Sequence, residues 1–327
     1  MTGRAAVAGV VRVRVAAVAV VGALAAFAVA YGILKASSSS RDAQAPEPVV
    51  TAVVPLRPVI TGLAVGSSGV WASSESGGAT TPSAGGLLWR IDRATNRPGS
   101  PIPLSGGGQG IAFAAGSVWT VSPEGTRRVD PKTGRVLAEI EGFGSALWVG
   151  QQRIDPATNA VAAVGSFDGF VNAIGPEGTW ARSDVLERVE PRTGQILATL
   201  RRPGFTPNAI GLGGGSAWVA YASRSEWETT VIVRIDPKTN RFAGDLVVLH
   251  GRVPSALVYA DGMLWLLAHN EEEQGARLTQ IDPKNGSVVG VPLHLTGGTP
   301  GLLVAQGSTL WVGEDLDQGT VTRVDLR

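Results

Sequence analysis

Cysteine is absent from the sequence of 327 residues, and histidine and methionine are scarce, with three and two copies. Without cysteine, the chain has no disulfide framework, thiolate metal ligand, cysteine nucleophile or cysteine-linked lipid. An excess of charge is also lacking, because Lys and Arg together number 28 against 27 for Asp and Glu. Since nucleic-acid-binding domains carry a basic patch, we expect no nucleic-acid partner.

Short motifs of several enzyme classes are missing as well. The sequence has no phosphate-binding glycine loop, no G-x-S-x-G nucleophile elbow and no H-E-x-x-H zinc motif. Its 44 glycines and 20 prolines are instead typical of a chain with many turns. We therefore expect no catalysis of those types.

A long apolar run lies near the N-terminus. The twenty residues from Val15 to Leu34 carry no charge, which is enough to span a bilayer as a helix. Arginines precede this run, so the positive-inside rule predicts a cytoplasmic segment at residues 1–14 and a transmembrane signal-anchor helix at residues 15–35. We expect a cell-membrane protein with a single span and an extracytoplasmic body.

The same region also fits a second interpretation. The small residues at Ala28 to Ala30 resemble a cleavage site, so a cleaved signal peptide and a secreted body remain open. Residues 36–48 are rich in Ser and Pro and predict a flexible linker. Both interpretations place residues 49–327 outside the cytoplasm.

Tryptophan recurs at regular spacing along the rest of the chain, each time in a short apolar run after a glycine turn. The seven positions are Trp71, Trp119, Trp148, Trp180, Trp218, Trp265 and Trp311. From the first to the last is 240 residues in six steps, or 40 per step, close to the roughly 40–45 residues of a four-stranded propeller blade. We therefore predict an all-β fold, a seven-bladed β-propeller.

One step of the repeat is short. Only 29 residues separate Trp119 from Trp148, so strand d of the second blade or strand a of the third is expected to be missing or merged. A six-bladed ring therefore remains possible. At the ends of the domain, "TVTRVDLR" stops after a strand c, and Val49 to Leu56 resembles the strand d that this last copy lacks. Pairing of these two segments would close the ring and leave no open sheet edge.

A motif in which an acidic residue is followed by P-x-T and then by Gly or Asn comes after strand c in the internal copies, with Arg93 in place of the proline in the first copy and Asn285 in place of the threonine in the last. Its acidic residues are Asp92, Asp130, Asp155, Glu190, Asp236 and Asp282. An acid suits the first position of a type I turn and proline the next, and the Gly or Asn four residues after the acid tolerates a positive φ. We interpret the acids as hairpin residues and the tryptophans as packing between blades. We expect the arginines before the motif to lay their stems over neighbouring blades and to direct their charged ends to carboxylates or carbonyls.

The stretch "AWVA", with "VIVRIDPKTN" after it, resembles the YVTN-type bacterial β-propellers and the wider group that includes streptogramin B lyase (virginiamycin B lyase). This resemblance covers nearly all of residues 49–327. Likeness to the lyase would imply a metal-assisted elimination that opens a cyclic depsipeptide, with histidines near the starts of the inner strands. The matching positions in this chain are Asn208, Ser255 and Gly301.

Candidate binding residues lie in the loops between strands b and c and in those between strands d and a, which open on one face of a propeller. An aromatic residue, Trp227, stands in the middle of one such loop. The other candidates are His250, His269, Glu271, Glu272 and Glu273. Two imidazoles and a carboxylate could hold a divalent ion, although an acidic run is more often a solvated loop. We expect no other cofactor.

These patterns predict a monomeric, non-catalytic module whose loop face binds a protein, a glycan or a small-molecule ligand. The N-terminal helix would be its contact with the membrane. Two alternatives remain open: a metal-dependent lyase, and a structural scaffold of a cell-envelope complex.

Overall fold

The computed structural model divides into two compact units, Met1–Gln44 and Ala45–Arg327. It describes residues 47–56, 59–75, 85–105, 107–108, 110–122, 125–141, 144–145, 148–149, 151–225, 229–243, 247–270, 273–296, 300–314 and 319–327. The predicted cytoplasmic segment, the predicted transmembrane helix and nearly all of the predicted linker lie outside these ranges. Within them, no helix has the length and the apolar character needed to cross a membrane.

The strands of the second unit form seven antiparallel sheets, which we number in chain order. Sheet 1 contains β2 (Ile60–Gly66), β3 (Gly69–Glu75), β4 (Gly86–Ile91) and β5 (Ile102–Leu104). Sheet 2 contains β6 (Gly110–Ala114), β7 (Ser117–Ser122), β8 (Gly125–Val129) and β9 (Val136–Ile140). Sheet 3 contains β10 (Gly144–Ser145), β11 (Trp148–Val149), β12 (Gln152–Ile154) and β13 (Val161–Val164).

The other four sheets repeat this order. Sheet 4 contains β14 (Phe170–Gly175), β15 (Gly178–Arg182), β16 (Leu186–Val189) and β17 (Ile196–Leu200). Sheet 5 contains β18 (Phe205–Gly213), β19 (Ser216–Ser223), β20 (Thr229–Asp236), β21 (Arg241–Phe242) and β22 (Val247–His250). Sheet 6 contains β23 (Val253–Ala260), β24 (Met263–His269), β25 (Ala276–Ile281) and β26 (Val288–Leu295). Sheet 7 contains β27 (Pro300–Gln306), β28 (Thr309–Glu314), β29 (Thr320–Leu326) and β1 (Pro48–Pro55).

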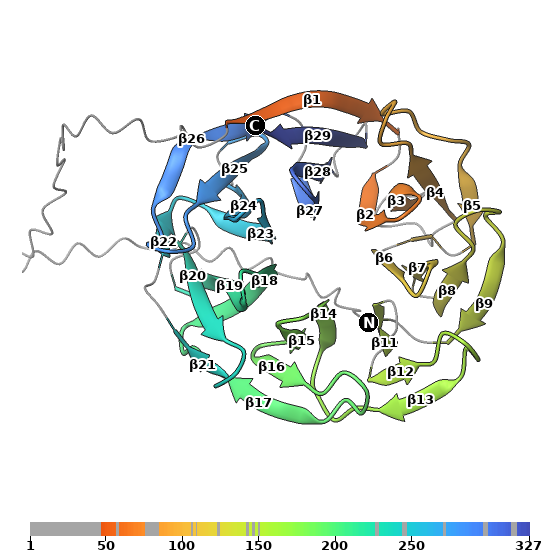
Figure 1. Ribbon diagram of the computed structural model, residues 1–327, viewed down its shortest axis with the longest axis horizontal. Coiled ribbons are helices and arrows are strands. Elements are labelled where there is room, and N and C mark those ends of the chain that lie inside the picture. Colours follow the sequence, from red (N-terminus) through yellow and green to blue (C-terminus); the bar gives the residue numbers. More distant parts are fainter. Residues whose placement is uncertain are drawn as a thin grey trace, which may run out of the picture. The chain divides into compact units, whose positions relative to one another are not determined.

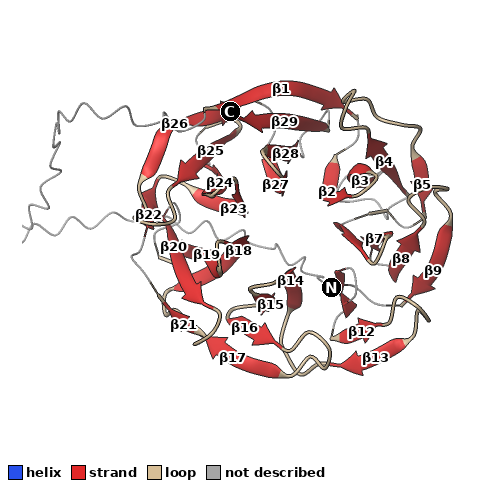
Figure 2. Cartoon of the chain, viewed as in Figure 1, coloured by secondary structure: helices blue, strands red, loops and turns tan. Residues whose placement is uncertain are grey.

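The sheets stand around a common centre with the first strand of each innermost (Figure 1). Each inner strand contacts the next in the order β2, β6, β10, β14, β18, β23 and β27, and β27 contacts β2 again. Strands are the regular structure throughout the described part of this unit (Figure 2). The prediction of an all-β propeller is therefore confirmed.

Sheet 3 is much smaller than the other six, because β10 and β11 have two residues each. The short step between Trp119 and Trp148 thus has a different cause from the predicted one. Both β9 and β10 are present, so neither strand is missing or merged. The spacing between the two tryptophans is short because β10 and β11 have two residues each and because the connection between β9 and β10 spans only residues 141–143.

The two ends of the propeller unit pair as the sequence predicted. Strand β1 runs antiparallel to β29, from Pro48 opposite Leu326 to Pro55 opposite Thr320. Beyond the strand, the backbone N–H of Leu56 donates to the carbonyl of Gly319 at 2.9 Å. The strand nearest the N-terminus therefore completes the last sheet, and closure joins both ends of the unit.

The repeated tryptophans form the core between sheets. All seven are at most 6% exposed, and they pack with the apolar residues of strands b and c. Each interior cluster contains side chains of two adjacent sheets; one joins Trp180 and Leu186 of sheet 4 to Tyr221 and Val231 of sheet 5. The structural interpretation of the tryptophans is confirmed.

The acidic motif forms the same turn in all six copies. The backbone N–H four residues after the acid donates to the acid's carbonyl at 2.7–2.9 Å. The carboxylate accepts a backbone N–H two residues on at 2.8–3.0 Å. The fifth residue has a positive φ of 55–74°, as predicted, at Asn96, Gly134, Asn159, Gly194, Asn240 and Gly286.

The arginines before this motif contact both their own sheet and the next one. Their guanidinium groups lie over the tryptophan of their own sheet, with Cζ 5.6–5.8 Å from the ring centroid at Arg128, Arg188, Arg234 and Arg323. The cause is register, because each of these arginines is directly opposite that tryptophan on the adjacent strand. A cation over an aromatic face is a favourable arrangement. Arg128 and Arg323 also donate to backbone carbonyls in the turn of the next sheet, as predicted for the charged ends.

Three of these arginines also link consecutive sheets. Arg128 donates to Asn159 at 3.0 Å, Arg188 to Asn240 at 2.7 Å and Arg323 to Asn96 at 3.1 Å, each from one sheet to the turn of the next. At the other three turns the fifth residue is Gly, and an added Cβ would come within 2.9 Å of the preceding sheet. The contact between each turn and the preceding sheet therefore alternates between a hydrogen bond at Asn and close packing at Gly.

Candidate functional site

The face opposite these turns, which we call the loop face, is formed by the b–c loops and the d–a connections. An ion pair confirms that the two kinds of loop adjoin. Arg252, between β22 and β23, pairs with Glu273, between β24 and β25, at 3.0 Å. Residues 76–84, 226–228, 271–272 and 315–318 of the b–c loops lie outside the described residues.

A β-bulge marks the loop-face end of five consecutive inner strands. In sheets 4, 5, 6, 7 and 1, the register shifts around one residue of the inner strand: Asn172, Asn208, Ser255, Gly301 and Thr61. A bulge leaves one residue out of the ladder and redirects its side chain, and bulges are frequent beside active sites. The three positions that matched the lyase's histidines are thus equivalent in the structure as well. They hold an amide, a hydroxyl and a hydrogen here, none of which is an imidazole.

Glu273 is the predicted site residue with the most complete set of partners. It pairs with Arg252 at 3.0 Å and with Arg277 at 3.1 Å. Desolvation opposes its charged form, but the charges of the two arginines outweigh that effect, so the pKa of Glu273 lies below its ordinary value. This carboxylate is therefore an anionic link between two loops rather than an open ligand for a metal.

The two predicted histidines lie on neighbouring elements, and each has a hydroxyl partner. His269 Nδ1 is 2.9 Å from the Ser255 hydroxyl, which belongs to the bulge of sheet 6. His250 Nδ1 is 3.3 Å from the Thr229 hydroxyl on β20. Neither contact joins the two rings to one another or to Glu273. Within the described residues, no three His, Asp or Glu side chains are grouped so that they could hold a metal ion.

Three predicted site residues, Trp227, Glu271 and Glu272, lie outside the described residues. Their assignment to the loop face rests on their position in the sequence. Trp227 belongs to the connection between β19 and β20, and the two glutamates follow the end of β24.

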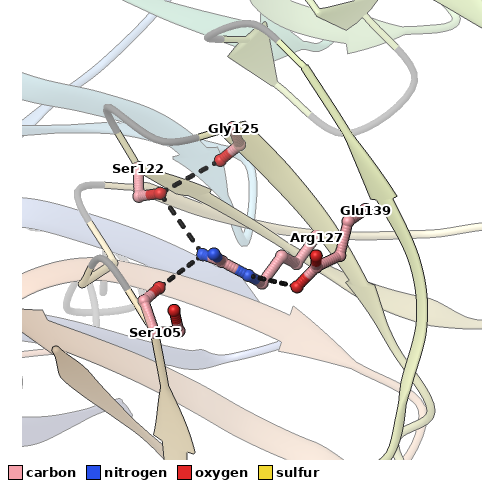
Figure 3. A network of polar contacts seen from close by, with 5 residues as sticks. All are labelled: Ser105, Ser122, Gly125, Arg127 and Glu139. Carbon is pink, nitrogen blue, oxygen red and sulfur yellow. Dashed lines mark hydrogen bonds and ion pairs between the residues drawn. The ribbon is translucent and has the colours of Figure 1, made fainter.

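A polar recess on the loop face of sheet 2 was not found from the sequence, and Figure 3 shows the polar contacts of Arg127, one of its lining residues. The recess has a volume of about 340 Å³ and is lined by Gly125, Thr126, Arg127, Glu139, Ile140 and Glu141. The side chain of Arg127 is 9% exposed and that of Glu139 is 67% exposed, and the two pair at 2.9 Å. Arg127 also donates to the Ser105 carbonyl on the side of sheet 1 and to the Ser122 hydroxyl.

The b–c connection of sheet 2 spans only residues 123–124, between β7 and β8. A signal for the recess was present in the repeat. Arg127 occupies the strand-c position before the repeated arginine or its equivalent, where the other six sheets have Trp89, Gln152, Glu187, Val233, Thr279 and Thr322. A cation at this position occurs only in sheet 2, and the structure places it in an ion pair at the recess.

No protein-family model matches the chain, and no curated protein matches its sequence.

Proposed function

We propose that this chain is a membrane-anchored, extracytoplasmic β-propeller that binds a protein, a glycan or a small ligand through its loop face without catalysis. The observation that carries the proposal is the recess of about 340 Å³ beside Arg127 and Glu139. Rigid scaffolds concentrate binding residues on the loops that they hold. The apolar run from Val15 to Leu34 supports the anchor.

The charge of the recess favours a partner with a positive group. Its lining has one cation, Arg127, and two carboxylates, Glu139 and Glu141. Because the Arg127 side chain is held by Glu139, Ser105 and Ser122, the exposed side of Glu139 is the part that faces solvent. An ammonium or guanidinium group of the partner would add a charge-assisted hydrogen bond there.

The ring architecture belongs to the proposal as well. We count the reduced sheet 3 as a blade, which makes the propeller seven-bladed, because its inner strand β10 contacts both β6 and β14. The likeness to YVTN-type propellers is in keeping with this architecture. The lyase chemistry has less support, since Asn208, Ser255 and Gly301 offer no titratable group at the matching positions.

Binding is tested by capture with the full-length chain. Tagged wild type is cross-linked in the membranes of its host, and the captured proteins are compared with those of Glu139→Lys, Trp227→Ala and a turn-face control, Lys132→Glu. We expect a partner that is lost from Glu139→Lys and Trp227→Ala and retained by Lys132→Glu. Identical capture by all four proteins would contradict binding through the loop face.

The anchor is tested separately. We expect the full-length chain to sediment with membranes, to resist extraction at high salt and to be cleaved by external protease in intact spheroplasts. A chain that is released at high salt or protected from protease would contradict the proposed placement.

A further inference from the structure

Two buried polar groups at the junction of sheets 4 and 5 have no hydrogen-bond partner among the described residues: the Tyr221 hydroxyl and Arg202 Nε. Tyr221 is 1% exposed. Burying a donor without an acceptor is costly, and most buried polar groups are paired for that reason. Unpaired donors at one place in a rigid scaffold therefore indicate a group that completes them.

The two groups come from adjoining elements on the loop-face side. Tyr221 is on β19, directly opposite Pro207 of β18, and packs with Trp180 and Leu200 of sheet 4. Arg202 lies in the connection between β17 and β18, with its guanidinium carbon 4.8 Å from the centroid of the Phe205 ring. Burial raises the pKa of Tyr221 to about 12, against the opposing effect of the Arg202 charge. The hydroxyl is thus a neutral donor beside a permanent cation.

A second cation reaches the same junction. Arg182, the last residue of β15, donates from Nη1 to the Pro207 carbonyl at 3.2 Å. Burial lowers the pKa of Arg182, and among the described residues no carboxylate pairs with either Arg182 or Arg202. The neighbouring Asp184 pairs with Arg224 at 3.3 Å. The junction therefore combines two guanidinium groups and a hydroxyl without an anion of its own.

We propose that this junction binds the carboxylate of a ligand. Arg202 Nε–H and the Tyr221 O–H would donate to its oxygens, and Arg182 would supply further positive charge. Donors without acceptors favour an anion over a cation or a neutral amide, and the planar carboxylate matches the geometry of a guanidinium group. This inference rests on the proposed function and adds to it the chemistry of one ligand group.

The test uses saturation-transfer NMR on the full-length chain with pairs of small probes that differ in charge. N-acetylglycine is compared with its neutral amide, and glucuronate with glucose, while inorganic phosphate serves as the competing oxyanion. The variants are Tyr221→Phe and Arg202→Gln, with Arg201→Gln as the matched control, because Arg201 is exposed and adjacent.

We expect saturation transfer to the acids and not to their neutral counterparts. Arg202→Gln should weaken binding of the acids about tenfold, Tyr221→Phe should weaken it about threefold, and Arg201→Gln should leave it unchanged. The two acid pairs separate a peptide terminus from a sugar acid as the source. Equal binding of acid and amide, unchanged binding in both variants, or phosphate binding more tightly than either acid would overturn the proposal.

Folding of the variants provides a second readout. Because the Tyr221 hydroxyl has no partner in the free protein, Tyr221→Phe should raise the thermal midpoint while it lowers affinity for the acid. A hydroxyl with a structural role would give a lower midpoint instead. If the acids fail to bind while partner capture still depends on Glu139, only the present inference is wrong. If the acids fail to bind and partner capture does not depend on Glu139 either, the proposed function is contradicted as well.

Discussion

The two faces of the propeller differ in how completely their polar groups are hydrogen-bonded within the protein. On the turn face, six copies of one turn repeat the same hydrogen bonds, and each acid is held by the backbone beside it. On the loop face, the connections differ in length from sheet to sheet, and the described polar groups include a partly exposed carboxylate at Glu139 and an unpartnered hydroxyl at Tyr221. The hydrogen bonds of the turn face stabilise the ring, whereas polar groups without a complete set of partners on the loop face can bind a ligand.

On the turn face, the turns with Asn differ from the turns with Gly in how they contact the preceding sheet. Asn turns in sheets 1, 3 and 5 accept an arginine from the preceding sheet, and Gly turns in sheets 2, 4 and 6 pack too closely for any side chain. Both residues tolerate the positive φ, so the choice between them is set by the neighbouring sheet. The alternation shows that joints between repeats can differ while the repeat itself stays uniform.

The largest effect should come from opening the ring. Deletion of residues 48–55 removes β1 together with the buried Val54, exposes the edge of β29 and uncovers the interior around Trp311. The loss should approach the whole stability of a domain, roughly 5–15 kcal/mol. We expect the cooperative thermal transition to disappear. A matched deletion of residues 37–44 should leave it in place, and equal melting of both deletions would contradict closure through β1.

Loss of the hydrogen bond at one Asn turn should destabilise the protein less than deletion of β1. Asn240→Gly keeps the turn but removes the acceptor of Arg188, so we expect a loss of about 1–2 kcal/mol in the free energy of unfolding, measured with denaturant.

The reverse change is the control for that prediction. Gly194→Asn keeps a residue that tolerates positive φ, but its Cβ would lie 2.7 Å from the Trp148 ring and 2.4 Å from Gly165 Cα. It should destabilise by more than Asn240→Gly, in the range of about 1–3 kcal/mol or above that is typical of overpacking. Tolerance of asparagine at this position would mean that the neighbouring sheet does not set the choice.

The smallest effect should be the pH dependence of a single turn acid. The backbone N–H of Lys238 is the largest of the hydrogen bonds that hold the pKa of Asp236 below its ordinary value of 3.8. A lowered pKa favours the folded state above 3.8, and this contribution is lost as the pH falls through the folded-state pKa. Asp236→Asn should therefore flatten the dependence of stability on pH below about 4. Acid titration of the thermal midpoint measures it, and an unchanged slope would contradict the prediction.

Much of the fold was predictable because it is local and repeated. The spacing of the tryptophans predicted the strands, and turn chemistry predicted the positive φ at Asn96 and its equivalents. The arginine contacts were less accessible, because the link from Arg188 to Asn240 spans 52 residues and depends on which sheets are neighbours. The size of sheet 3 was misassigned, since a short spacing cannot show which strands have lost residues.

The candidate site was predictable only in part. Loop position predicted that the loop of His250 would lie beside the loop that follows His269 and contains Glu273, and the ion pair between Arg252 and Glu273 joins these two loops. Glu273 was considered as a possible metal ligand, and its ion pairs with Arg252 and Arg277 were not predicted. The recess at Arg127 lies within sheet 2, and its signal in the sequence was the cation at one position of the repeat. The junction at Tyr221 arises where side chains of sheets 4 and 5 meet, and a single sequence carries no direct signal for such contacts.

The most direct test of the division between the two faces compares binding and stability in one pair of variants. For Glu139→Gln, on the loop face, which removes the charge but keeps an oxygen that can accept from Arg127 Nε, we predict loss of partner capture with a thermal midpoint close to that of wild type. For Asn240→Gly, on the turn face, we predict a lower midpoint with capture retained. If Glu139→Gln lowers the midpoint and keeps the partner, or if Asn240→Gly loses the partner while still folded, the two faces do not divide binding from stability.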